Sequence, residues 1–232
     1  MNLTLLHSPL VGPATWNSLA PILRARGHCA AVPDLTPLMA GEGPYYAALA
    51  EGAASGISDD TIVVAHSGAG ALVPAIATLA ARRLRGAVFV DALLPHPGAS
   101  WFAGVPPELG TRLRSLAKDG KLPPWHAWWP KGAMEALLPD RAMGAAFLAE
   151  QGELPLAYFE ELAPALTLDL AIAYLQLSEA YAADADSAAE LGAPVLRLNL
   201  HHLAPMTHPD AVADGIERLV LTLGGGGRTL PP

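Results

Sequence analysis

The sequence has a single cysteine among its 232 residues. One cysteine cannot form a disulfide within the chain, so disulfide chemistry contributes nothing to this fold. Cys29 lies in the apolar run of residues 29–32. We therefore expect its side chain to be a buried core residue with no role in the chemistry.

Charged residues are also few, and basic residues are the scarcer kind. They make up 16% of the chain, and 14 Lys and Arg against 22 Asp and Glu give a formal net charge of -8. The basic residues gather only at Arg82, Arg83 and Arg85, near the end of an expected helix. Proteins that bind nucleic acid carry a basic patch or stripe, so we expect no nucleic-acid partner.

Long hydrophobic runs are missing as well. The longest runs, such as residues 61–65 and 87–90, are far shorter than the roughly 20 residues of a membrane span. Residues 2–6 enter a strand pattern at once, without the basic start and apolar stretch of a signal peptide. We therefore expect a cytoplasmic protein with no membrane partner.

Hydrophobic residues account for 52% of the chain, which is typical of a compact globular protein. A chain of this length can bury one large core, so we expect a single domain. The sequence contains no internal repeat and gives no indication of the oligomeric state.

Short β-rich runs alternate with helical patterns along most of the chain. Several of these runs are apolar throughout, as strands are when both faces of a parallel sheet are covered. The expected strands span residues 3–7, 28–33, 61–66, 86–91, 171–177 and 194–200, and the expected helices span residues 16–26, 45–55, 68–83 and 210–222. The alternation predicts an α/β fold with a mostly parallel sheet flanked by helices.

Residues 91–171 break this alternation with several helix candidates separated by Pro and Gly. No crossover between strands needs so long a segment, so we interpret most of it as an inserted helical lid. The predicted organisation is a core of residues 1–94 and 167–223 and a lid of residues 95–166. The Gly-rich end, residues 224–232, is predicted to be a flexible tail.

A candidate nucleophile follows the third expected strand, in the segment VVAHSGAG of residues 63–70. Ser67 has Ala65 and Ala69 two positions to either side, and a strand-to-helix elbow with a nucleophilic serine requires small residues there. The alternative is a serine that only caps a helix. The position between strand and helix favours the nucleophile, with His66 as a lining residue of the site.

Three segments carry a resemblance to a known family. Residues 6–16 (LHSPLVGPATW) match an opening loop that ends in Trp and a helix, residues 88–95 (VFVDALLP) match a sixth-strand segment, and residues 202–209 match a C-terminal histidine loop. The chain thus resembles the α/β-hydrolase superfamily, within it the plant esterase and hydroxynitrile lyase branch with its bacterial relatives. The resemblance implies the α/β-hydrolase fold, with the helical lid inserted after strand six.

Three histidines near the last expected strand compete for the role of general base. The base should directly follow that strand, which favours His202 or His201, whereas His208 is expected to begin the final helix. In the family that the chain resembles, a Pro commonly follows seven residues after the catalytic histidine, and Pro209 selects His202. The adjacent histidines point apart and lack an acidic companion at ligand spacing, so we expect no metal.

Two acids fit the chain order of this fold, which is serine, then acid, then histidine. In the branch that the chain resembles, the acid follows strand seven, but this sequence has Ala180 at the matching position, next to Glu179. Haloalkane dehalogenase relatives instead carry the acid after strand six, where this chain has Asp91. We predict Asp91 as the acid, with Glu179 as the alternative; a purely structural Asp91 is the other interpretation.

The opening loop departs from the esterase pattern. A tetrahedral intermediate needs hydrogen-bond donors for its oxyanion, and the Gly68 amide supplies the first. The resemblance assigns the second to position 9, but Pro9 has no N–H. The Leu10 amide, the Ser8 hydroxyl or a Trp indole of the lid would have to replace it, unless the chemistry forms no oxyanion.

Two features bear on the choice between hydrolysis and other chemistry. Ser8 falls where the lyases of this branch carry Thr, but Leu203 stands where they carry Lys. Within the lid, Trp125, Trp128 and Trp129 either line an apolar pocket or only bury the lid against the core.

We therefore predict a serine hydrolase that cleaves a carboxylic ester, lactone or thioester of a small apolar metabolite through Ser67, His202 and Asp91. The alternatives are a lyase or cyclase that uses Ser67 and His202 for proton transfer, and a non-catalytic binding protein. No phosphate-binding loop or metal-ligand spacing occurs, so we expect no cofactor.

Overall fold

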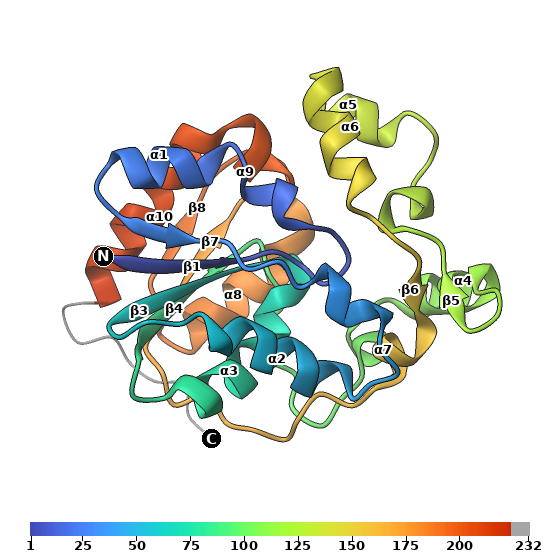
Figure 1. Cartoon of the computed structure of the whole chain (residues 1–232), viewed down its shortest axis with the longest axis horizontal. Coiled ribbons are helices and arrows are strands. Elements are labelled where there is room, and N and C mark those ends of the chain that lie inside the picture. The colour runs from blue at the N-terminus through green and yellow to red at the C-terminus, as the bar shows by residue number, and fades with distance from the viewer. Residues whose placement is uncertain (224–232) are drawn as a thin grey trace.

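A six-stranded parallel sheet forms the centre of the computed structural model, which describes residues 1–223 (Figure 1). The strand order is β2-β1-β3-β4-β7-β8. The strands are β1 (Asn2–Leu6), β2 (Cys29–Ala31), β3 (Thr61–His66), β4 (Leu84–Val90), β7 (Ile172–Gln176) and β8 (Val195–Arg197). All six expected strands are present, and the predicted α/β fold is confirmed. The expected tail, residues 224–232, lies outside the described residues.

Helices cover both faces of the sheet, with α1 (Leu19–Ala25) and α10 (Pro209–Leu223) on one side and α2 (Tyr45–Ser55) and α3 (Val73–Ala80) on the other (Figure 1). Successive strand residues point to opposite faces. In β3, Val63 packs into the core on the α2 and α3 side, whereas Val64 packs into the core on the α1 and α10 side. The largely apolar sequences of the central strands follow from this double coverage.

Two of the expected helices begin with a 3-10 turn, and the helix expected over residues 68–83 ends earlier, at Ala80. The expected helix of residues 16–26 consists of η1 (Pro13–Trp16) and α1, and that of residues 68–83 consists of η3 (Ser67–Leu72) and α3. The remaining core elements are η2 (Thr36–Ala40), η6 (Glu179–Tyr181), α8 (Ala182–Glu190) and α9 (Ala204–Thr207).

Cys29 corrects one expectation, because its side chain is exposed. It lies on β2, which is an edge strand that pairs only with β1 in the sheet. In β2 the side chain of Ala30 is buried, while those of Cys29 and Ala31 point the other way and remain exposed. The apolar run is therefore covered on one face only, and the prediction of a buried thiol was wrong.

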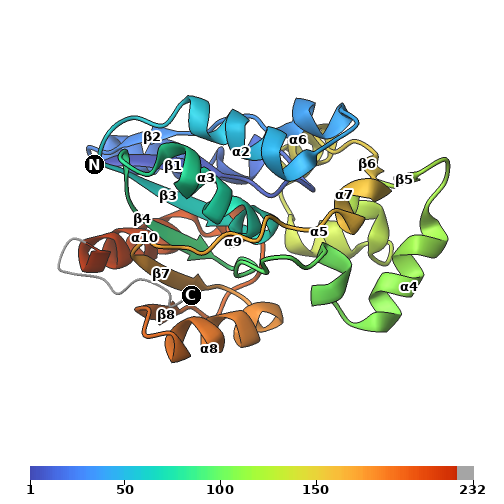
Figure 2. The same ribbon diagram turned by 90° about the horizontal axis from the view of Figure 1, so that it is seen from below.

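The segment between β4 and β7 gathers at one end of the molecule (Figures 1 and 2). Its elements are η4 (Trp101–Gly104), α4 (Pro107–Leu116), β5 (Lys121–Leu122), η5 (Trp125–Trp128), α5 (Ala133–Leu137), α6 (Arg141–Ala149), β6 (Leu154–Pro155) and α7 (Leu156–Glu160). The strands β5 and β6 form a separate antiparallel pair. The helical content agrees with the expected insertion, whereas the proposed boundaries of the lid stay a prediction.

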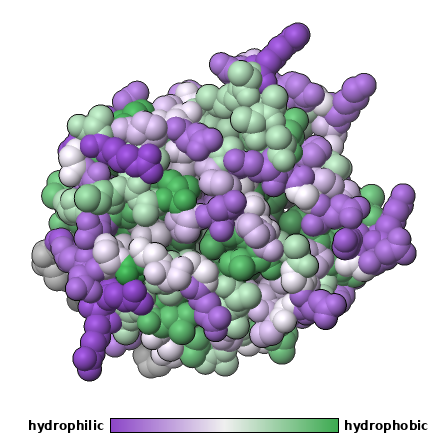
Figure 3. All heavy atoms as spheres, in the orientation of Figure 1, coloured by the Kyte–Doolittle hydropathy of each residue, from purple (hydrophilic) through white to green (hydrophobic). Residues whose placement is uncertain are grey.

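Hydrophilic and hydrophobic side chains are interspersed over the face of the molecule that Figure 3 shows. Among residues 1–223, no helix has the length and apolar character needed to span a membrane. The loops that follow the parallel strands open at a common edge of the sheet, which is where sites of α/β proteins form.

Candidate active site

Ser67 directly follows β3 in the left-handed backbone region, with a φ of 57°. A serine that only caps a helix has extended backbone angles, so this conformation is that of an elbow. Ala65 and Ala69 are fully buried, and a side chain at Gly70 would overlap the Leu93 carbonyl oxygen. Gly70 is therefore required by the close passage of the segment that follows β4.

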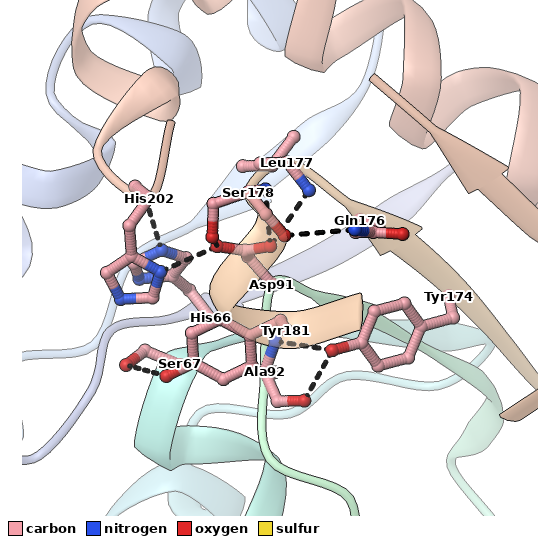
Figure 4. Close-up of polar contacts among 10 residues, drawn as sticks. All are labelled: His66, Ser67, Asp91, Ala92, Tyr174, Gln176, Leu177, Ser178, Tyr181 and His202. Carbon is pink, nitrogen blue, oxygen red and sulfur yellow. Dashed lines mark hydrogen bonds and ion pairs between the residues drawn. The ribbon is translucent and has the colours of Figure 1, made fainter. Parts of the chain in front are cut away.

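Asp91 follows β4 and is fully buried. Its Oδ2 accepts hydrogen bonds from His202 Nδ1 at 2.8 Å and Ser178 Oγ at 2.6 Å (Figure 4). Its Oδ1 accepts from the amides of Leu177 at 2.8 Å and Ser178 at 2.9 Å. Burial alone would raise the pKa of Asp91, but the hydrogen bonds from His202, Ser178 and Leu177 hold it below its ordinary value. The side chain is therefore a carboxylate.

His202 lies in the loop between β8 and α9, with its ring between two aromatic neighbours. The His66 ring stacks at 4.5 Å between centroids, and the Tyr181 ring stacks at 4.9 Å with an interplanar angle of 7°. Because Nδ1 donates to Asp91, the neutral imidazole presents Nε2 as its proton acceptor. This is the tautomer that a general base needs.

The His66 side chain contacts the loop that carries His202. Its Nε2 donates to the His202 carbonyl oxygen at 2.9 Å. Burial, and after it the nearby His202, lower the pKa of His66 to about 3, so that its ring is neutral. Among the described residues, His66 Nδ1 has no hydrogen-bond partner, and neither has Nε1 of Trp16, whose ring meets His66 edge-on.

The two other candidate histidines lie elsewhere. His201 Nε2 and His208 Nδ1 both contact Thr207 Oγ1 at 2.9 Å. Within residues 1–223, no hydrogen bond or ion pair joins either ring to Asp91. The same residues contain no cluster of three or more His, Cys, Asp or Glu that could hold a metal ion.

Only one of the two candidate acids contacts His202 in the described residues. Asp91 contacts His202, whereas Glu179 begins η6 with an exposed side chain. In the described part of the chain, no hydrogen bond or ion pair links Glu179 to His202. The loop after β7 nevertheless takes part, since Ser178 and Leu177 bind the Asp91 carboxylate.

Tyr181 is a site residue that the sequence reasoning missed. Its hydroxyl lies 3.2 Å from Ser67 Oγ (Figure 4). Burial raises the pKa of this phenol well above its ordinary value, so it keeps its proton. The available signal was its place just beyond the carboxyl end of β7. Within residues 1–223, Ser67 Oγ makes no hydrogen bond to His202, and such bonds are often completed only when substrate binds.

The opening loop is fixed by His7 and lies against the elbow. His7 Nδ1 donates to the Ser8 carbonyl at 2.8 Å, and His7 Nε2 accepts from the Leu35 amide at 3.0 Å. Burial lowers the pKa of His7, so the ring holds the loop as a neutral bridge. The Leu10 amide donates to Ser8 Oγ at 3.3 Å.

A cavity of about 440 Å³ opens above Ser67, Gly68 and His202. Its walls are mostly apolar and come from both the core and the inserted segment. They include Leu10, Leu93, Trp101, Leu109, Trp125, Trp128, Trp129, Met134, Leu137 and Tyr181. The three predicted tryptophans all line it. A second hollow, of about 600 Å³, shares Leu93, Trp101 and Asp184 with this cavity. Ser67 and His202 are not among its lining residues.

Comparison with known proteins finds likeness at the level of structure. Neither a protein-family model nor a curated protein matches the sequence. An extracellular α/β-hydrolase from a Paenibacillus species, described as sharing structural and functional homology with tobacco salicylic acid binding protein 2, superimposes with a TM-score of 0.76 at 19% identity. The match covers 94% of this chain and 98% of that one.

Two further solved structures are similar to this chain. A pyrethroid hydrolase from Sphingobium faniae JZ-2 gives a TM-score of 0.70 at 18% identity and covers 94% of this chain and 96% of its own. Tomato methylketone synthase I gives 0.66 at 15% identity and covers 96% and 98%. The chain therefore has the α/β-hydrolase fold and resembles the plant esterase branch and bacterial hydrolases, as expected.

Proposed function

We propose that the protein is a serine hydrolase that cleaves a carboxylic ester, lactone or thioester of a small apolar molecule. The observation that carries this proposal is the serine in a left-handed elbow beside a buried, hydrogen-bonded Asp91–His202 pair. The similar solved structures that carry the names of hydrolases support the same class of reaction.

In this mechanism Ser67 Oγ attacks the carbonyl carbon of the substrate while His202 Nε2 accepts the hydroxyl proton. The electron pair of the C=O bond moves to the carbonyl oxygen, and the Gly68 amide donates to the resulting oxyanion. Asp91 holds the tautomer of His202 and stabilises the imidazolium. His202 then gives its proton to the leaving oxygen or sulfur, and an acyl group remains on Ser67.

Water completes the reaction. His202 accepts a proton from a water molecule, whose oxygen attacks the acyl carbon, and the proton then returns to Ser67 Oγ as the acid is released. The apolar walls of the cavity favour an apolar acyl or alkyl group, since binding sites for such ligands carry few polar groups.

A lyase or cyclase remains the second candidate, with Pro9 and the likeness to tomato methylketone synthase I in its favour. Against a cyanohydrin lyase stands Leu203, which is buried in an apolar cluster and offers no cation beside His202. A pure binding protein would have no use for the aligned Asp91 and His202.

The test is covalent labelling with a fluorophosphonate, followed by intact mass measurement, and hydrolysis of p-nitrophenyl butyrate. We expect one adduct on the wild-type protein and none on Ser67→Ala, together with ester hydrolysis that Ser67→Ala lacks. A folded wild-type protein that forms no adduct and hydrolyses no ester would contradict the proposal.

A further inference from the structure

Pro9 has no backbone N–H and so cannot be the second oxyanion donor. The proline Cδ takes the place of an amide hydrogen, and here it lies 3.6 Å from the point where a Cβ on Gly68 would stand. The ring therefore faces the donor residue of the elbow. At the position where an N–H would help to bind the oxyanion, the loop presents a methylene group.

Three other candidate donors belong to the opening loop and the insertion, and two of them already donate to protein acceptors. The Leu10 amide donates to Ser8 Oγ. Ser8 Oγ lies 2.9 Å from the point where a Cβ on Gly68 would stand, but the residue is only 2% exposed. It lines a space of about 10 Å³ beside Ser67 and His202, and not the cavity of about 440 Å³. The Trp128 indole donates to the Pro123 carbonyl at 2.9 Å. Of these three groups, only the Ser8 hydroxyl donates no hydrogen bond within residues 1–223, and Ser8 is not among the residues that line the cavity above Ser67.

Tyr181 meets the requirements that these groups do not. It lines the substrate cavity together with Ser67 and Gly68, and its hydroxyl already contacts Ser67 Oγ at 3.2 Å. The ring lies nearly parallel to His202, which fixes the direction of the hydroxyl. The phenol is neutral, so it has a hydrogen to donate.

We propose that the Tyr181 hydroxyl is a catalytic residue that supplies the second hydrogen bond to the oxyanion, beside the Gly68 amide. This inference rests on the proposed serine hydrolase function. When Ser67 Oγ bonds to the carbonyl carbon, its proton passes to His202 and the C=O electron pair moves to the carbonyl oxygen. That oxygen is then two bonds away from Oγ, within reach of the hydroxyl that had contacted Oγ. Tyr181 keeps its own proton throughout.

The decisive variant is Tyr181→Phe, which keeps the ring that stacks on His202 and removes only the oxygen. With p-nitrophenyl butyrate we expect kcat to fall roughly 10²-fold to 10³-fold, as for loss of one oxyanion donor. KM should change little, because the bond strengthens only in the transition state. Far-UV circular dichroism and thermal melting should match those of the wild type.

Tyr45→Phe is the matched control. Its hydroxyl donates to the Gly41 carbonyl at 3.0 Å, and the residue does not line the cavity. We expect its kcat and KM to equal those of the wild type.

Two inhibitor measurements separate a catalytic role from a structural one. A trifluoromethyl ketone, which forms a tetrahedral adduct with a reactive serine, should bind Tyr181→Phe more weakly in proportion to the loss in kcat/KM. The rate of fluorophosphonate labelling should fall as well, and this readout works even for a poor ester substrate.

The outcomes are distinguishable. If the wild type labels at Ser67 but Tyr181→Phe labels and turns over equally well, Tyr181 is no donor. Faster turnover in Tyr181→Phe would also overturn the inference, because the hydroxyl would then be restraining Ser67. If the wild type neither labels nor hydrolyses, the proposed function itself fails.

Discussion

The carboxylate of Asp91 receives four hydrogen bonds, of which the one from His202 Nδ1 orients the imidazole. In Asp91→Asn, the amide can favour the wrong tautomer of His202, and such a change can cost about 10⁴-fold in kcat. We expect a loss of this size in steady-state hydrolysis of p-nitrophenyl butyrate. Glu179→Gln should retain full activity, since Glu179 is exposed. If Glu179→Gln alone were impaired, the assignment of the acid would be wrong.

His66 gives the folded protein a dependence on acid. An unfolded histidine takes up a proton near pH 6.5, whereas burial holds the pKa of folded His66 at about 3. Between these values the unfolded chain binds more protons, so the free energy of unfolding falls as the pH falls below about 6.5. Urea unfolding between about pH 7 and pH 5 should show this decline, and His66→Asn should reduce the slope. Equal slopes for both proteins would contradict the prediction.

The candidate site could be predicted from the sequence only where a residue's role constrains its neighbours in the sequence or its order along the chain. Ser67 stands out by its small neighbours, and chain order restricts the acid to a few positions. Tyr181 has no such sequence signal, because its contact with Ser67 forms only when the loops after β3 and β7 come together in the fold. Cys29 was misjudged because a strand sequence does not say whether the strand lies at the edge.

At the scale of elements, the sheet was predictable and the insertion was less so. Strands such as Thr61–His66 have an apolar centre, here residues 62–65, and α2 matches its expected bounds. The insertion consists of short pieces such as α5 and α7, of five residues each. Helices this short are not stable by themselves, so packing against neighbours decides where they form.

The opening loop offers a test that involves two elements. Pro9→Ala would place an N–H where the proline Cδ now faces Gly68. If this amide and the Tyr181 hydroxyl serve the same oxyanion, Pro9→Ala should restore kcat in Tyr181→Phe by about tenfold or more and change the wild type less. Such coupling of two changes is measured by a double-mutant cycle. Equal effects of Pro9→Ala in both backgrounds would mean that the two positions act independently.

At the scale of the whole molecule, the cavity above Ser67 lies between the core and the inserted segment, and Leu137 of α5 contributes to its wall. Leu137→Trp should fill part of the roughly 440 Å³. We expect hydrolysis of p-nitrophenyl octanoate to fall strongly while that of the acetate is retained. Leu148→Trp on α6 is the control, since Leu148 lines a different hollow. A uniform loss with both esters would contradict a role of Leu137 in acyl selection.

Two residues of the proposed triad, Ser67 and Asp91, have left-handed backbone conformations, with φ values of 57° and 44°. These conformations lower the thermal stability of the protein. Such conformations cost about 1 kcal/mol or more for residues other than glycine. Ser67→Gly should therefore unfold at a higher temperature than Ser67→Ala, although neither can react, and equal melting temperatures would contradict this. Screening for thermostability without an activity assay would accordingly enrich glycine at position 67 and remove the proposed nucleophile.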